Sequence, residues 1–82
     1  MNQAIQFVDR VEYINGVLTF YAMASGMLIP CTIDMDNIER SDALTHFAQL
    51  RFDYEEVAQQ LIEDEEFTAE GQVVIPPLAP LR

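Results

Sequence analysis

Two glycine-containing turn signals constrain the fold of this 82-residue chain more than any other feature. Asn15-Gly16 and Ser25-Gly26 lie ten residues apart in a segment rich in β-branched and aromatic residues. A two-residue type I′ turn requires positive φ at both central positions, which asparagine tolerates and glycine adopts without a Cβ clash. The spacing therefore predicts a meander of three antiparallel strands.

The three predicted strands differ in regularity, but the second and third have little charge on either face. The first, over Ile5–Ile14, is interrupted near Asp9. The second, Val17–Ala24, alternates an apolar face with a mildly polar one, which indicates that both faces are partly covered. The third, Met27–Asp34, contains Pro30, and because proline cannot donate to a ladder, we expect a sheet edge or a bulge there.

The hydrophobic period changes from two to about 3.6 after Asp36, which indicates helices. Asp36 opens a short helical turn in this interpretation, and Ser41 or Asp42 caps a second helix. Asp53 is the expected N-cap of the next helix, with Glu56 three residues later. The apolar stripe of that helix consists of Tyr54, Val57, Ala58, Leu61 and Ile62.

The chain is expected to end in a further strand and a tail. Gly71 supplies a turn, Gln72–Ile75 is the strand, and Pro76-Pro77 stops it. We therefore predict one α+β domain over residues 1–76, followed by an extended Pro-rich tail over 77–82. Its sheet is small and mainly antiparallel, built from the N-terminal meander plus the C-terminal strand, with two or three helices on one face.

The charge balance argues against several classes of partner. The formal net charge is −10, there is no lysine, and the basic side chains are Arg10, Arg40, Arg51 and Arg82. No basic cluster is available to neutralise phosphates, so we expect neither nucleic-acid nor membrane binding. No apolar stretch approaches the roughly 20 residues that span a bilayer, and the N-terminus does not resemble a signal peptide. The expected location is the cytoplasm.

Residue types that carry chemistry occur singly in this chain. Cys31 is the only cysteine and lies in an apolar run, where it is expected to be a buried hydrophobe. His46 is the only histidine, for which we expect a solvent-facing or capping role. The acidic segment from Asp34 fails as an EF-hand because Glu39 and Thr45 occupy its sixth and twelfth positions. We expect no enzyme, no catalytic residue, no cofactor and no EF-hand calcium site.

Acidic residues gather late in the chain and leave three interpretations open. The candidate acidic patch consists of Glu55, Glu56, Glu63, Asp64, Glu65 and Glu66. It is a solvated helix face, a docking patch for a basic protein partner, or part of a divalent-metal or small-ligand site. The residues considered for that last site are Asp34, Asp36, Glu63, Asp64 and Glu66.

The weak polarity of the predicted strands suggests a surface for self-association. Contiguous apolar patches larger than a few hundred Å² are uncommon on monomers. The candidate residues are Val17, Tyr21, Met23, Leu28 and Pro30. We therefore expect a non-enzymatic protein-interaction module that forms a homodimer through the second face of the sheet or its Pro30 edge. The alternatives are a metal- or ligand-binding protein and an acidic mimic of nucleic acid that binds a basic protein.

Three segments carry a resemblance to a known family. They are the opening Met1–Phe7 followed by Asp9-Arg10, the central apolar hairpin, and the run Leu61–Glu65. Together they resemble the short bacterial proteins grouped as domain of unknown function 1488, and the similarity spans nearly the whole chain. The resemblance implies a bacterial, intracellular, single-domain α+β protein. It transfers no catalytic residue, because that family has no established activity.

Overall fold

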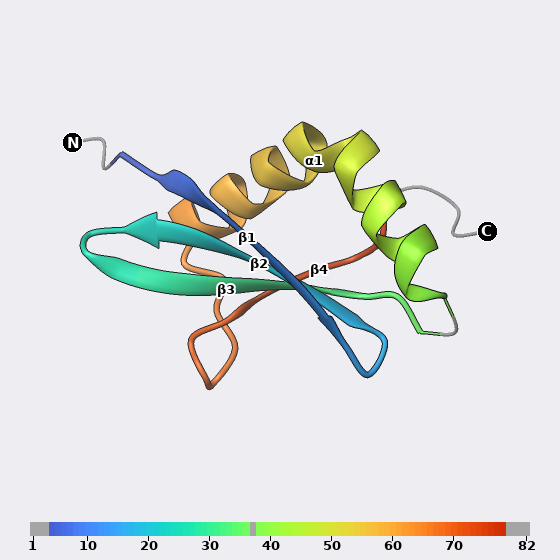
Figure 1. Cartoon of the computed structure of the whole chain (residues 1–82). Helices are drawn as coiled ribbons and strands as arrows, with labels where there is room; N and C mark the ends of the chain where they lie inside the picture. The colour runs from blue at the N-terminus through green and yellow to red at the C-terminus, as the bar shows by residue number, and fades with distance from the viewer. Residues whose placement is uncertain (1–3, 37, 79–82) are drawn as a thin grey trace.

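One helix covers one face of a four-stranded sheet within residues 4–36 and 38–78, which the computed structural model describes (Figure 1). The elements in chain order are β1 (Gln6–Ile14), β2 (Val17–Ala24), β3 (Met27–Asp34), α1 (Arg40–Glu63) and β4 (Val73–Ile75). The strand order is β1-β2-β3-β4, with antiparallel pairing except between β3 and β4, which are parallel. The predicted α+β class and mostly antiparallel sheet are confirmed.

Both predicted hairpin turns are present with the expected backbone. Asn15 and Gly16 have φ of 55° and 80°, and Ser25 and Gly26 have φ of 52° and 76°. The first turn also anchors the end of β3, because the Met35 N–H donates to the Gly16 carbonyl at 2.7 Å. The turn sequences therefore set the register of the meander, as expected from local conformational preference.

The interruption predicted in the first strand is a register irregularity. The pairing of β1 with β2 shifts between Phe7 and Val11, so the chain around Asp9 does not follow the regular ladder. The expectation of a sheet edge at Pro30 is confirmed locally, because Pro30 pairs with β2 on one side while pairing of β3 with β4 begins only at Cys31. There is no bulge at Pro30, because β3 pairs with β2 without a shift.

The expectation of two or three helices is wrong for the described residues, where α1 is a single helix of 24 residues. Its backbone is non-helical only at Leu50, with φ −113° and ψ 19°, and the helix continues through the predicted start at Asp53. Glu39, with extended backbone, is the N-cap in place of Ser41 or Asp42. No helix begins at Asp36. Residues 40–63 contain neither glycine nor proline, so the chain bends without ending the helix.

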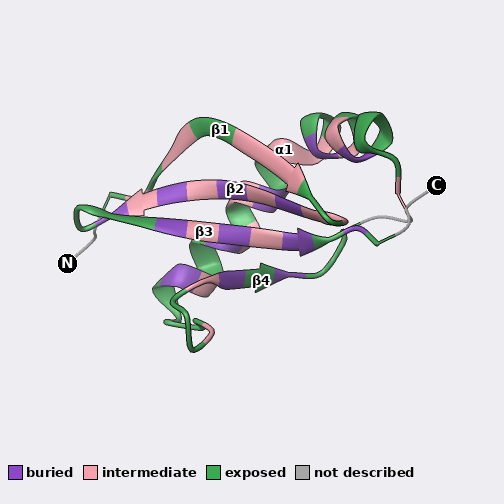
Figure 2. Ribbon diagram, turned by 60° about the horizontal axis from the view of Figure 1, so that its bottom comes forward, coloured by how far each residue is buried: buried purple, intermediate pink, exposed green. Residues whose placement is uncertain are grey.

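The core lies between α1 and the inner face of the sheet. Figure 2 shows buried positions alternating with more exposed ones along β2 and β3. Aromatic rings join the layers, because the ring of Phe47 on α1 lies 4.9 Å from that of Phe20 on β2, centroid to centroid. Tyr54, also on α1, lies 5.8 Å from Phe47. The largest fully buried side chains are Tyr54, Leu18, Ile33, Met35, Ile75, Val73 and Cys31. One helical layer thus shelters only one side of the sheet.

The C-terminal strand is confirmed as β4, and the chain after it returns to α1. The Leu78 N–H donates to the Tyr54 hydroxyl at 3.0 Å. Most of the predicted extended tail, residues 79–82, lies outside the described residues. No helix among the described residues combines the length and apolar character needed to cross a bilayer.

Candidate functional site

The sheet face opposite α1, here called the open face, is mostly apolar. In Figure 2 the strands lie in front of α1, and no described element covers their near side. The register and the alternation of burial place on this face Val17, Thr19, Tyr21, Met23, Leu28, Pro30, Thr32 and Val74. All five residues predicted for self-association are among them. The cross-strand partners Gln6, Glu12, Ile14 and Asp34 lie on the same face and give it a polar margin.

The structure brings four of the five predicted residues into one cluster. Tyr21 is opposite Pro30, and Met23 is opposite Leu28, in adjacent cross-strand pairs of β2 and β3. Val17 lies farther along the face, opposite Asp34. The Leu28 side chain is 43% exposed, whereas Tyr21, Met23 and Pro30 are half-buried. The cluster is a continuous apolar surface rather than a set of isolated side chains.

A polar clamp flanks this cluster beside the irregular part of β1. Arg10 Nη2 lies 2.8 Å from Glu12 Oε2, and the Tyr21 hydroxyl donates to Glu12 Oε1 at 3.0 Å. The guanidinium carbon of Arg10 is 4.6 Å from the centroid of the Tyr21 ring. The hydrogen bond from Arg10, followed by that from Tyr21, lowers the pKa of Glu12. The clamp orients the Tyr21 ring, and it could not be predicted from sequence because it depends on the β1 register.

The six residues of the candidate acidic patch do not form one cluster. Glu55 accepts a hydrogen bond from Arg51 Nε at 2.9 Å, so its charge is paired. Glu56 and Glu63 are exposed on one side of α1, two turns or about 10 Å apart. The other three, Asp64, Glu65 and Glu66, are exposed where α1 ends. This arrangement provides a diffuse negative field.

The acidic residues considered for a metal site are far apart. Asp34 Oδ1 accepts the Asp36 N–H at 3.2 Å, which closes a local turn before α1 begins. Glu63 and the acidic residues after it follow the other end of the 24-residue helix, roughly 30 Å away at 1.5 Å per residue. Among the described residues, no group of three or more His, Cys, Asp or Glu side chains is placed to hold a metal ion.

The two singular residues singled out by sequence differ in burial. Cys31 is fully buried, as expected, and burial raises the pKa of its thiol to about 12. His46 is half-buried within α1, so it does not cap the helix, and its Nε2 lies 2.7 Å from the Tyr54 hydroxyl. That hydroxyl accepts the Leu78 N–H, and both contacts are satisfied when it donates to Nε2.

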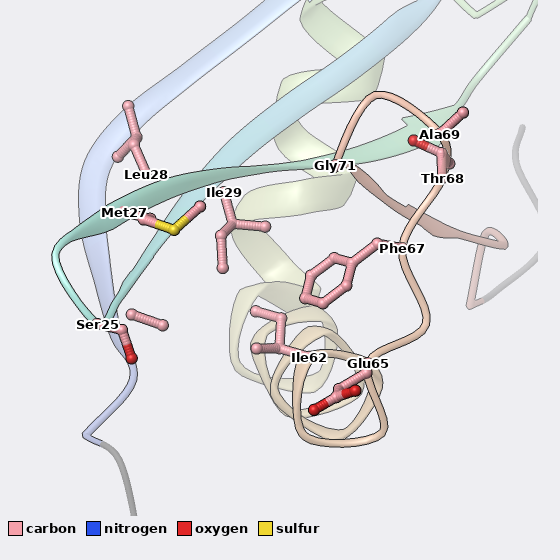
Figure 3. Close-up of a pocket in the computed structure, with 11 residues that line it drawn as sticks. Ser25, Met27, Leu28, Ile29, Ile62, Glu65, Phe67, Thr68, Ala69 and Gly71 are labelled. Atoms are coloured by element: carbon pink, nitrogen blue, oxygen red, sulfur yellow. The ribbon is translucent and has the colours of Figure 1, made fainter.

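A pocket of about 410 Å³ lies beside the β2–β3 hairpin, and sequence reasoning missed it (Figure 3). Its walls come from the β2–β3 hairpin, the end of α1 and the loop before β4. Met27, Ile29, Ile62 and Phe67 supply apolar surface, and Glu65 supplies a carboxylate. The one signal in the sequence is Phe67, an aromatic residue that follows the acidic run.

Comparison with known proteins places the chain in a family. The family model described as "Protein of unknown function (DUF1488)" matches residues 5–75. The "Uncharacterized protein YrdB" of Escherichia coli strain K12 is 34% identical over 85 residues, covering 93% of this chain and 100% of YrdB. The Shigella flexneri protein of the same name matches to the same extent.

A solved structure supports the same assignment. The crystal structure of a DUF1488 family protein of unknown function from Shewanella loihica PV-4 superposes with a TM-score of 0.80 at 35% sequence identity. The match covers 92% of this chain and 94% of the Shewanella chain. Sequence and fold therefore agree over the meander, α1 and β4, and this chain belongs to the DUF1488 family of proteins of unknown function.

Proposed function

We propose that this protein is a non-enzymatic interaction module that self-associates through the open face. The observation that carries the proposal is the contiguous cluster of Tyr21, Met23, Leu28 and Pro30 on a sheet face that no described element covers. Burying such a surface removes apolar area from water, and aromatic, methionine and arginine side chains are enriched in interfaces. A two-fold symmetric dimer would place each cluster against its equivalent.

The distribution of charge is compatible with this mode of association. The exposed carboxylates of Glu56 and Glu63 lie on α1, which packs on the opposite face of the sheet. A dimer through the open face keeps the two helices on the outside, where their charges are solvated and far apart. Association through α1 would instead bring these carboxylates together at an energetic cost.

The area of the open face indicates how tightly the proposed dimer should bind. Three strands of eight or nine residues and the three-residue β4, at roughly 3.3 Å per residue and 4.8 Å between strands, span roughly 440 Å² of sheet. Stable interfaces bury about 800 Å² on each partner, so the dimer belongs with the smaller and weaker interfaces. We expect a dissociation constant in the micromolar range.

Sedimentation equilibrium from 1 μM to 1 mM protein tests the proposal. The wild-type chain should pass from monomer to dimer over this range, and Met23→Lys should weaken the dimer at least tenfold because it places a charge in the apolar cluster. Phe52→Lys is the matched control, since Phe52 is 83% exposed on α1. A wild-type mass that stays monomeric throughout, or equal effects of the two substitutions, contradicts the proposal.

The other sequence-based hypotheses have less support. A metal site lacks a suitable group of ligands among the described residues. The acidic mimic of nucleic acid is a prediction that rests on net charge, and the separation of Glu55 from the residues at the end of α1 gives it no defined surface. The cytoplasmic location is likewise a proposal drawn from sequence.

A further inference from the structure

A strand position beside β3 is vacant next to the pocket. β4 pairs with β3 only over Cys31–Ile33, so the side of Met27–Pro30 that faces away from β2 has no strand beside it among the described residues. Continuing the β4 register backwards would place Gly71 opposite Ile29. The chain turns away at that point instead, and the pocket occupies the space between β3 and the loop.

A compact turn holds the loop away from β3. Gly71 has φ of 80°, and its N–H donates to the Thr68 carbonyl at 2.9 Å. The Gln72 N–H donates to Thr68 Oγ1 at 3.1 Å, and the Thr68 N–H donates to the Gln72 carbonyl at 2.8 Å. These hydrogen bonds pair backbone groups of the loop within the loop itself. The loop therefore does not need to pair with β3, and the space beside β3 follows from the fold.

The backbone of Leu28 faces this space. Hydrogen-bonded and non-hydrogen-bonded pairs alternate along an antiparallel ladder, and the pair that flanks a two-residue turn is hydrogen-bonded. Ala24 and Met27 form that flanking pair, so Leu28, opposite Met23, directs its N–H and carbonyl away from β2. The next outward-facing position is Pro30, which offers a carbonyl and no donor. One residue can therefore form both backbone bonds to an added strand.

The pocket supplies a site for a side chain beside that backbone. Figure 3 shows Ile29, Ile62 and Phe67 directed toward a common space, with the Glu65 carboxylate nearby. A volume of about 410 Å³ lies within the range of ligand pockets, and its lining residues include no basic side chain. The walls suit a large apolar group, and the acidic run that includes Glu65 suits a neighbouring cation.

We propose that an extended peptide segment of a partner protein binds here as an added strand beside β3. It places one large apolar side chain, such as leucine, methionine or phenylalanine, in the pocket. A lysine or arginine next to that side chain lies near Glu65. Backbone hydrogen bonds to Leu28 supply the strand-addition mode of recognition, and the pocket and the carboxylate supply selectivity. This site extends the proposed function to a second surface and a basic, apolar partner.

Peptides of the form Lys-Thr-X-Thr-Lys, acetylated and amidated, are suitable probes for the full chain. Fluorescence anisotropy should show at least tenfold tighter binding when X is leucine, methionine or phenylalanine than when X is alanine or aspartate. Amide chemical shifts in 15N spectra should change at Leu28 and over residues 67–71. Equal affinity for all X, no measurable binding, or shifts confined to other residues would overturn the proposal.

Three matched comparisons locate the contacts. Ala69→Phe fills the pocket and should weaken binding of the leucine peptide at least tenfold, whereas Ala48→Phe, exposed on α1, should not. Glu65→Gln should weaken binding of the leucine peptide several-fold, whereas the control Glu56→Gln should leave this binding unchanged. N-methylation of both threonines should abolish binding, because it removes backbone donors and blocks pairing. Peptides that bind regardless of these changes exclude strand addition.

Leu28 belongs to both the open face and the pocket lining, but the strand site and self-association can fail separately. Met23→Lys disrupts the open face but leaves the pocket lining unchanged, so this variant should bind the leucine peptide within twofold of wild type. Failure of peptide binding with an intact dimer would reject the strand site alone. A monomeric wild type that binds the peptide would reject only the dimer.

Discussion

The hydroxyl of Tyr54 and the imidazole Nε2 of His46 lie 2.7 Å apart on α1, eight residues apart in sequence. The same hydroxyl accepts the N–H of Leu78, so one buried group joins the helix to the chain that follows β4. Sequence predicted Tyr54 in the apolar stripe of a helix and a solvent-facing or capping role for His46. The pair instead forms a polar contact at the boundary between the core and the C-terminal segment.

Replacing this hydroxyl should destabilise the protein. Tyr54→Phe keeps the packing against Phe47 but leaves the Leu78 N–H and the half-buried His46 Nε2 without their shared partner. We expect a loss of about 1 kcal/mol in the free energy of unfolding, measured by urea denaturation. Tyr21→Phe is the control, because its hydroxyl bonds Glu12, which keeps Arg10 as a partner. Equal stability of Tyr54→Phe and wild type would show that the contact is dispensable.

The Cys31 thiol should be unreactive in the folded protein. Burial raises its pKa from an ordinary value near 9 to about 12, so little thiolate is present in the native state at pH 8. Modification by a maleimide should therefore follow the rate of transient opening and accelerate in denaturant. Rapid stoichiometric labelling without denaturant would contradict the buried environment.

The same shift predicts a loss of stability at high pH. The folded pKa lies above the unfolded one, so the unfolded chain releases this proton first as pH rises. The stabilisation is complete below pH 9 and decreases between pH 9 and 12, by up to about 1.4 kcal/mol per pH unit. Urea denaturation from pH 7 to 10.5 measures the slope. Cys31→Ala should show a shallower slope, although buried Tyr54, whose pKa is also raised, keeps it from zero.

The two hairpin glycines should tolerate alanine equally poorly. Both have positive φ, so each alanine substitution should cost roughly 1–2 kcal/mol in the free energy of unfolding from backbone strain. A Cβ at Gly26 meets no atom within 4 Å, and one at Gly16 lies at ordinary contact distance, 3.4 Å, from the Asp36 Cα. Strain rather than a steric clash should therefore set both costs. Thermal unfolding of Gly16→Ala and Gly26→Ala checks this, and a variant as stable as wild type would contradict the positive φ at that turn.

Added salt should raise both the melting temperature and the fraction of dimer. A formal charge of −10 on 82 residues repels itself, and ions screen that repulsion over about 10 Å at 0.1 M. Melting curves at 10 mM and 500 mM sodium chloride measure the first effect, and sedimentation at the same two concentrations measures the second. A flat response in both would mean that the carboxylates are too widely spaced to interact.

Features that depend on a few neighbouring residues were predictable. Asn15-Gly16 and Ser25-Gly26 specify positive φ by themselves, so the turns and the meander followed from sequence. The interruption near Asp9 followed from a local break in alternation. The number of helices was not predictable from sequence. A potential N-cap at Asp53 begins a new helix only if the residues immediately before it leave the helical conformation, and here they remain helical.

Sequence alone determined the alternation that gives the sheet two weakly polar faces, because side chains on a strand point to opposite sides with period two. Only the tertiary structure decided that α1 is one bent helix, since burying Phe47 and Tyr54 against the same sheet keeps the chain helical across Leu50. It also decided which face is open and where the pocket lies. Both depend on the packing of segments far apart in the chain, which no local pattern specifies.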